Sequence, residues 1–478
     1  MKSAQVIERI DKTTTVNPST SYKKPFALMT SVFFAWGFMM TWNDLLIPRF
    51  KDAFTLSFFQ AMLVQLAYNG GYFLGALGYY LLSVLSGDLI GRVGYKNGVV
   101  IGLGIVGIGT ALFFPAAMVM SYAFFLAALF TIGVGFSLLQ ITANPYVIIL
   151  GPERTASSRL NIAQGFASFG TTVGPIVGSL LIFGFFFRSS ASGANAVKIP
   201  YVCCAIVFFL LALIFRHAEL PEFTSKEASF PSGLGALRYP HMVLGIVAIF
   251  LYVGAEVSIG SSIINFLGLK QIAGLSHAGA GRFLSFYWGG LMAGRFMGGF
   301  ALSSMPQKLK SLLITLVPLT AFGIAAGALG WANALHYGAC LGVLACSFYA
   351  GASKPSRMLT IFSLVLVAML AIGILTTGLT AQWAILGTGL FCSIMWSNIF
   401  SLAIEGLGPL KSQASSLLIM AILGAAVIPP LQGAVADHWG IQTSFIVPML
   451  ALAYVAFYGA FGHRAGRSKT ICADYREC

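Results

Sequence analysis

The feature that most constrains this chain is a series of fourteen apolar stretches, each long enough to cross a lipid bilayer. A helix needs about 20 mainly apolar residues to span the hydrocarbon core. Well inside these stretches lie only three ionisable side chains, Asp44, Glu256 and Arg295. A charge at the centre of a spanning helix costs about 2.5 to 3.5 kcal/mol on insertion scales, so such residues are candidates for function. The pattern predicts an all-α polytopic membrane protein with spans at 26–48, 61–85, 97–117, 121–148, 160–187, 199–215, 242–267, 283–303, 311–330, 334–350, 357–377, 383–403, 414–435 and 441–462.

The composition excludes a soluble globular fold. Charged residues make up 9% of the chain and hydrophobic residues 58%, against about 25% and about 45 to 50% in an average soluble domain. A single soluble core cannot hide that much apolar surface. The first apolar run, from Phe26 to about Pro48, is too long for the core of a cleavable signal, so we expect it to be retained. The seven cysteines show neither a zinc spacing nor a paired redox motif.

The basic residues alternate between the two sides of the expected spans. With the amino terminus inside, 21 Lys and Arg residues fall in inside segments, 6 fall in outside segments, and Arg295 lies within a span. The side richer in positive charge is the cytoplasmic side. We therefore expect both termini in the cytoplasm and the spans in a plasma membrane, such as the bacterial inner membrane. The net charge of +14 is dispersed over short loops, which does not favour a nucleic-acid partner.

Two glycine motifs occur twice. The first runs from Tyr68 to Gly75 and returns at Tyr287 to Gly294, and the second, at Gly170 to Pro175, returns at Gly424 to Pro429. The offsets are 219 and 254 residues, so an insertion separates two homologous halves. The predicted organisation is a cytoplasmic tail (1–25), a six-helix half (26–215), a cytoplasmic linker (216–241), a second half (242–462) with an inserted helix pair (311–350), and a second cytoplasmic tail (463–478).

A loop motif and five longer segments carry a family resemblance. The loop between the second and third spans, with Gly87, Asp88, Arg92, Gly94 and Lys96, resembles the cytoplasmic loop signature of the major facilitator superfamily, although Gly91 stands at its usual Asp. More specifically, the chain is similar to the fucose/glucose/galactose permease family, closest to the glucose/galactose branch, in the segments Trp36 to Pro48, Leu138 to Tyr146, Arg159 to Thr172, Tyr252 to Ser261 and Ile399 to Leu410.

The resemblance implies a major facilitator fold of two six-helix halves, here with the inserted pair, that rock around a central sugar site. It implies import of a neutral hexose of the glucose, galactose or fucose type, driven by a co-transported cation. We expect this cation to be H⁺ rather than Na⁺, because a lone desolvated carboxylate suits a proton, whereas sodium needs several oxygen ligands. We expect no enzymatic activity, no cofactor and no bound metal. The expected partners are a small sugar and the lipid bilayer, and the expected state is a monomer.

Two polar stripes suit a neutral sugar. Ser137, Gln140 and Asn144 follow helical spacing, and Asn161, Gln164 and Ser168 repeat it on the next span. Amides offer hydroxyl groups both donors and acceptors. The alternative is that these amides only bridge neighbouring helices. Three aromatic residues, Trp36, Tyr287 and Trp288, can stack on a pyranose ring or merely pack against other side chains. With Asn43 of the family motif and the four amides, the predicted sugar-binding residues are Trp36, Asn43, Gln140, Asn144, Asn161, Gln164, Tyr287 and Trp288.

The two carboxylates are the predicted cation-coupling residues. Asp44 belongs to the Asn43-Asp44 pair of the family motif, although it lies near the outer end of its span. Glu256 lies near mid-span, and apolar surroundings favour the neutral form that a proton carrier needs. The alternative for Glu256 is a static ion pair with Arg295. Arg295 is otherwise assigned, with the loop motif, to gating.

Departures from the family pattern narrow the prediction. The fucose branch carries a glutamate where Gln140 stands, so this chain cannot use that position for protons. Trp396, Ser397 and Asn398 replace the Phe-Pro-Thr of many relatives, which leaves the exact sugar open.

Other functional classes lack their motifs. No phosphate-cradling GxxxxGK[ST] is present, and the six histidines lie at span ends or in loops, which argues against an embedded enzyme. A sugar sensor derived from a transporter, or a Na⁺-coupled symporter of another sugar such as N-acetylglucosamine, remains the alternative function.

Overall fold

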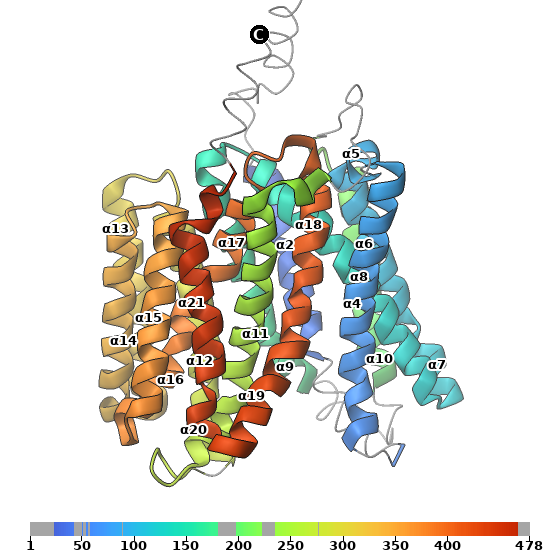
Figure 1. Ribbon diagram of the computed structural model, residues 1–478. Helices are drawn as coiled ribbons and strands as arrows, with labels where there is room; N and C mark the ends of the chain where they lie inside the picture. The colour runs from blue at the N-terminus through green and yellow to red at the C-terminus, as the bar shows by residue number, and fades with distance from the viewer. Residues whose placement is uncertain are drawn as a thin grey trace, which may run out of the picture.

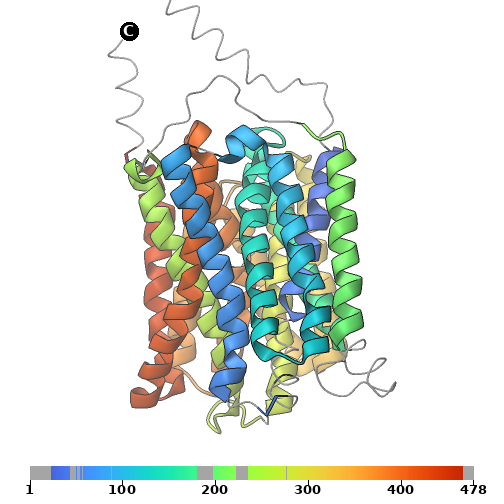
Figure 2. The same cartoon turned by 90° about the vertical axis from the view of Figure 1, so that its right-hand side faces the viewer.

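The structure is a computed structural model, and it describes residues 23–42, 50, 54–55, 58–87, 89–179, 197–221, 235–275 and 277–466. The described chain is helical throughout, and no strand is assigned in these ranges. Figures 1 and 2 show the long helices running side by side between two ends of the molecule. Asn43, Asp44 and Asp88, named above as site residues, lie outside the described residues.

The first part of the chain forms the helices that Figure 1 colours from blue to green. They are α2 (Lys23–Met40), α4 (Phe58–Ser86), α5 (Leu89–Val93), α6 (Tyr95–Ala111), α7 (Phe113–Val119), α8 (Tyr122–Ile149), the short 3₁₀ helix η1 (Glu153–Thr155), α9 (Ala156–Ser179) and α10 (Lys198–His217).

The second part of the chain begins with the short 3₁₀ helix η4 (Gly235–Arg238). Its further elements are α11 (Pro240–Gly268), α12 (His277–Ala301), α13 (Gln307–Leu329), α14 (Trp331–Ala350), α15 (Pro355–Leu375), α16 (Gly378–Cys392), α17 (Met395–Ile404), η5 (Gly408–Leu410), α18 (Lys411–Met420), η6 (Ala421–Leu423), α19 (Gly424–Trp439), α20 (Ile441–Ser444), α21 (Ile446–Ala460) and η7 (Gly462–Arg464).

Nine helical segments among the described residues are long and apolar enough to cross a membrane. They are Tyr95–Val119, Tyr122–Ile149, Lys198–His217, Pro240–Gly268, Gln307–Leu329, Pro355–Leu375, Gly378–Ile404, Lys411–Trp439 and Ile441–Ala460. The other five expected spans overlap α2, α4, α9, α12 and α14. The described part of the chain is therefore all-helical, and its apolar spans indicate a multi-pass membrane protein.

The ends of several helices follow from local sequence. Ser121 caps α8, where its Oγ accepts a hydrogen bond of 3.3 Å from the backbone N–H of Phe124. Pro240 and Pro355 begin α11 and α15, at positions where a missing N–H costs nothing. In the loop motif, Gly87 and Gly94 have φ values of 78° and 89°, a region that favours glycine. The two motif glycines thus form the turns on either side of α5.

The repeated motifs make the same helix contacts twice. Gly133 of α8 faces the Tyr68 carbonyl of α4, and Gly389 of α16 faces the Tyr287 carbonyl of α12, both so closely that a Cβ would collide. Glycine permits this approach between spanning helices. The second motif behaves alike, since Gly170 faces Phe34 of α2 and Gly424 faces Phe250 of α11.

The helix pair 311–350 lies at the edge of the molecule. In Figure 1, α13 and α14 stand at the left margin. They pack against each other, α12, α15 and α16, and only 17% of the apolar window of α13 is buried. The neighbouring helix α15 packs on α16 and α21 just as α6 packs on α8 and α10. Helices α13 and α14 therefore form a peripheral pair, and α15 packs in the second part as α6 does in the first.

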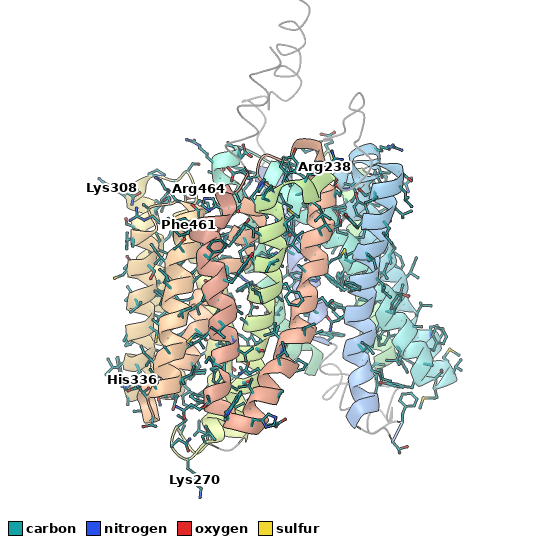
Figure 3. The ribbon with its side chains drawn as sticks, viewed as in Figure 1. Arg238, Lys270, Lys308, His336, Phe461 and Arg464 are labelled. Atoms are coloured by element: carbon teal, nitrogen blue, oxygen red, sulfur yellow. The ribbon has the colours of Figure 1, made fainter. Side chains whose placement is uncertain are left out.

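The labelled basic residues separate to two ends. Figure 3 shows Arg238, Lys308 and Arg464 at one end of the molecule and Lys270 at the opposite end.

Candidate functional site

The interrupted helix formed by α16 and α17 is the most buried of the membrane-spanning candidates in the described part of the chain. All residues in the apolar window of Gly378–Ile404 are buried. The helix is interrupted at Ser393 and Ile394, between α16 and α17. It packs against α11, α12, α14 and α15, and α17 also reaches α9 of the first part. Side chains near this interruption are therefore held by several helices at once.

Glu256 lies in this interior on α11. Its carboxylate accepts a hydrogen bond from the hydroxyl of Tyr252, one turn earlier. Its backbone carbonyl accepts a second hydrogen bond, of 2.9 Å, from the Tyr287 hydroxyl on α12. Tyr252 Oη also lies 2.7 Å from the carbonyl oxygen of Cys392, the last residue of α16. The backbone carbonyl of Glu256 thus joins α11 to α12, and the Tyr252 hydroxyl joins α11 to α16.

Arg295 of α12 lies near Glu256 but makes its hydrogen bonds elsewhere. The two residues interact electrostatically. The Arg295 guanidinium donates through Nη1 to Ser168 Oγ of α9, and through Nε, at 3.2 Å, to the Ser393 carbonyl at the α16–α17 interruption. Arg295 therefore links the two parts of the chain, with a longer-range attraction to the carboxylate.

The first polar stripe lies on α8 and is buried. Asn144 Nδ2 donates 2.6 Å to Gln140 Oε1 and 2.9 Å to the Gln140 carbonyl. Asn144 Oδ1 is buried and has no protein partner. An unpaired buried acceptor is costly, so this amide retains capacity for a polar ligand.

The second stripe, on α9, meets α17. Asn161 Nδ2 donates 2.8 Å to the Ser157 carbonyl and 3.3 Å to Asn398 Oδ1. Asn161 Oδ1 and Asn398 Nδ2 are buried without a partner. Gln164 is also buried, one turn further along α9. Asn398, named in the sequence only as a departure from relatives, is thus a direct neighbour of a predicted site residue.

The predicted aromatic residues differ in exposure. Tyr287 is fully buried, whereas Trp288 is 43% exposed. Their rings lie edge to face with centroids 5.2 Å apart. Trp36 is half-buried on α2, and its Nε1 is buried without a partner. Trp288 is therefore partly accessible, while the Tyr287 hydroxyl bonds to the Glu256 backbone.

Hydrogen bonds close the two parts of the chain against each other at the start of α9. The Oγ atoms of Ser157 and Ser401 lie 2.6 Å apart, and Ser158 Oγ donates 2.6 Å to the Gly299 carbonyl of α12. Beside them is a cavity of about 480 Å³ whose lining includes Arg154, Lys354 and Glu405. At this point, neutral hydroxyl groups hold the two parts of the chain together.

Arg159, the residue after Ser158 on α9, fixes the end of α8. It is 9% exposed. It donates 2.9 Å to the Val147 carbonyl, 3.0 Å to that of Pro152, and a further bond to that of Ile148. The last carbonyls of a helix lack partners within the helix, so this guanidinium satisfies the end of α8.

The loop motif lies away from these groups. Arg92 is exposed and Lys96 is half-buried at the start of α6. The structure therefore does not bring Arg92 or Lys96 together with Glu256 and the amide stripes.

Comparison with known proteins identifies the family. No protein-family model matches the chain. The chain is 39% identical to the glucose/galactose transporter of Brucella abortus over 92% of its length and 95% of that protein. It is 30% identical to the L-fucose-proton symporter of Escherichia coli over 93% and 94%.

The chain belongs to the fucose/glucose/galactose permease family of the major facilitator superfamily. It is similar in structure to the Escherichia coli fucose:proton symporter, with a TM-score of 0.73 and 28% identity over 93% of this chain and 99% of that one. A second structure, of a major facilitator superfamily transporter in the outward conformation, gives a TM-score of 0.74. The predicted family is confirmed, and the protein is a transporter rather than an enzyme.

Three residues of this permease were not predicted as site residues. Tyr252 lies inside a family segment, but only the fold shows that it bonds to Glu256. Ser401 and Asn398 lie on α17, more than 230 positions from their partners Ser157 and Asn161. Their small polar side chains in an apolar segment were the available signal.

Proposed function

We propose that this permease imports a neutral hexose together with H⁺ by alternating access. The observation that carries the proposal is the carboxyl of half-buried Glu256, which bonds to the fully buried Tyr252 in the same helical interior as amides that retain unused hydrogen-bonding capacity. Relatives named as glucose/galactose transporter and L-fucose-proton symporter support this reading.

The proposed sugar contacts come from α2, α8, α9 and α12. The free Oδ1 atoms of Asn144 and Asn161 accept from sugar hydroxyls, while Trp288 supplies a stacking surface. The remaining proposed contacts are Trp36, Asn43, Gln140, Gln164 and Tyr287, of which Tyr287 acts by supporting its neighbours.

The proposed coupling residues are Glu256 and Asp44. At Glu256, H⁺ suits the geometry better than Na⁺. The nearby Arg295 guanidinium disfavours a second cation, whereas a proton simply neutralises the carboxylate. Gly87, Asp88, Arg92, Gly94 and Lys96 are assigned to the cytoplasmic loop, and Arg295 to the gate between the halves.

We also propose the arrangement in the membrane. The fourteen expected spans would form halves at 26–215 and 242–462, joined by the linker 216–241. The insertion at 311–350 lies in the second half, and the tails 1–25 and 463–478 face the cytoplasm. The hydrogen-bonded interface at the start of α9 then closes the cytoplasmic side, which makes this an outward-facing state of a monomeric transporter in the plasma membrane.

The test is uptake by transport-null cells and by vesicles. Glucose, galactose and fucose should be concentrated under an imposed pH gradient, and a sodium gradient alone should not replace it. Sugar phosphates should not compete, because phosphate sites are built from basic groups, and the amide stripes are neutral. Binding of hexoses without net uptake would instead indicate a sensor, and tight binding of a phosphorylated sugar would contradict the proposed site.

A further inference from the structure

The hydroxyl of Tyr252 lies between two hydrogen-bond acceptors. One is the carboxylate of Glu256 on its own helix, and the other is the carbonyl of Cys392, 2.7 Å away on α16. Tyr252 is fully buried, so water does not compete for its proton. A phenol carries one O–H donor, and the carbonyl can only accept.

Whether both contacts of Tyr252 can be hydrogen bonds therefore depends on the protonation state of Glu256. When Glu256 is protonated, its O–H donates to Tyr252 Oη, and Tyr252 donates onward to the Cys392 carbonyl, so both contacts are hydrogen bonds. When Glu256 is ionised, the single Tyr252 proton goes to the carboxylate, because bonds to charged groups are the stronger ones. The Cys392 carbonyl then loses its partner.

Cys392 occupies a sensitive place in the fold. It is the last residue of α16, and α17 begins at Met395. The final carbonyls of a helix have no partner within it, so the Tyr252 hydroxyl acts as a cap for α16. Beyond the interruption, α17 carries Asn398 and Ser401, both bonded to α9.

The other titratable groups around Glu256 are known. They are Tyr287 and Arg295 on α12, which interact with it electrostatically, and the Cys392 thiol. Tyr287 donates to the Glu256 backbone carbonyl, and Arg295 donates to Ser168 and Ser393. Unlike Tyr287 and Arg295, Tyr252 bonds to the Glu256 carboxyl itself and also contacts the Cys392 carbonyl at the end of α16.

We propose that Tyr252 is a positioning residue that transmits the protonation of Glu256 to the α16–α17 interruption, and through α17 to the interface with α9. This inference rests on the proposed coupling role of Glu256. Protonation caps α16 and completes the relay from Glu256 through Tyr252 to Cys392. Deprotonation leaves the end of α16 uncapped and so favours a position of α17 away from α9.

The experiment compares four reconstituted proteins: the parent, Tyr252→Phe, Glu256→Gln and the double variant. Tyr454→Phe is the matched control, because its hydroxyl also donates to α11, 3.2 Å from the Leu244 carbonyl. We measure uphill accumulation under a pH gradient, sugar exchange without a gradient, and the pH profile of both.

Tyr252→Phe should lose accumulation by at least about tenfold, as expected for a bond to a charged group, while keeping exchange within about threefold and flattening its pH profile. Glu256→Gln carries a fixed donor that imitates the protonated acid, so adding Tyr252→Phe should change its coupling no further. Tyr454→Phe should behave like the parent. Parent-like accumulation and an unchanged pH profile in Tyr252→Phe overturn the inference.

The Glu256→Gln arm separates the two hypotheses. If Glu256→Gln concentrates sugar like the parent, the coupling role of Glu256 itself fails. If Glu256→Gln is uncoupled but Tyr252→Phe is not, only the relay fails.

Difference infrared spectroscopy on the same proteins gives a second readout. The carboxyl C=O band that appears on acidification and is missing in Glu256→Gln should move to higher frequency in Tyr252→Phe, because a hydrogen bond is lost. If Tyr252→Phe does not fold, the parent still decides: a Glu256 band at the frequency of a carboxyl group without hydrogen bonds overturns the inference.

Discussion

Ser157 of α9 and Ser401 of α17 share a hydrogen bond of 2.6 Å between their hydroxyl groups, across the boundary between the two proposed halves. Either hydroxyl can act as the donor. Such a neutral bond is worth only about 0.5 to 1.5 kcal/mol. An interface held in this way can close firmly and still open within the energy of a transport cycle.

A disulfide in place of this bond should trap the closed state. The Oγ separation matches the close approach that two cysteine side chains need. We expect Ser157→Cys with Ser401→Cys to lose uptake on oxidation and to regain it on reduction. The measurement is uptake before and after each treatment, with each single variant as the control. Full uptake by the oxidised double variant, with the cross-link verified, would show that this interface does not move.

Neutralising the carboxylates should separate coupling from binding. Glu256→Gln and Asp44→Asn should lose accumulation against a gradient, because the carrier of the proton is gone. At least one of them should still bind or exchange sugar. Uphill uptake in vesicles under an imposed pH or sodium gradient, beside equilibrium exchange, measures both properties. If both variants concentrate sugar like the parent, these carboxylates do not couple the ion.

Two glycines of the repeated motif region should respond oppositely to alanine. A Cβ at Gly389 would collide with the Tyr287 backbone of α12, whereas a Cβ at Gly289 meets nothing within 4 Å. Gly389→Ala should cost about 1 to 3 kcal/mol by overpacking. Gly289→Ala should be neutral or stabilising by up to about 1 kcal/mol. Thermal unfolding in detergent compares the two, and equal losses of stability would contradict the helix contact described here.

Replacing Arg295 by lysine should impair transport although the charge is kept. The guanidinium donates in two directions, to Ser168 Oγ and to the Ser393 carbonyl, and a lysine ammonium does not reproduce this planar fork. We expect accumulation to fall about tenfold or more, the effect of losing one charge-assisted bond. The control is Arg282→Lys, at an exposed position of the same helix. Parent-like transport by Arg295→Lys would mean that only its charge is used.

The sequence predicted the helices and the family because both depend on local patterns. Apolar length places spans such as 242–267 on α11. The glycine motifs predicted a repeat along the chain, and the structure places the contacts of one motif between α4 and α8 and again between α12 and α16. The segment 311–350 holds no charged residue and few polar groups, which favours the peripheral position that α13 and α14 occupy.

The partners of individual side chains were beyond the sequence. Glu256 and Arg295 were considered as an ion pair, but Glu256 bonds to Tyr252 and Arg295 bonds to Ser168 and Ser393. Such choices depend on how helices distant in the chain rotate and cross, and periodicity within one helix does not determine this. The interruption between α16 and α17 was likewise missed, because Ser393 and Ile394 lie inside one continuous stretch, 383–403, that is long enough for a single span.

Arg159 has a mechanical consequence. Its guanidinium binds the last turn of α8 while its own backbone lies in the first turns of α9, so these two helix ends form one stiff corner. A displacement that separates Ser157 from Ser401 must then move α8 together with α9, and with α8 the side chains of Gln140 and Asn144. Opening of this interface and displacement of the proposed sugar-binding amides would then be a single movement.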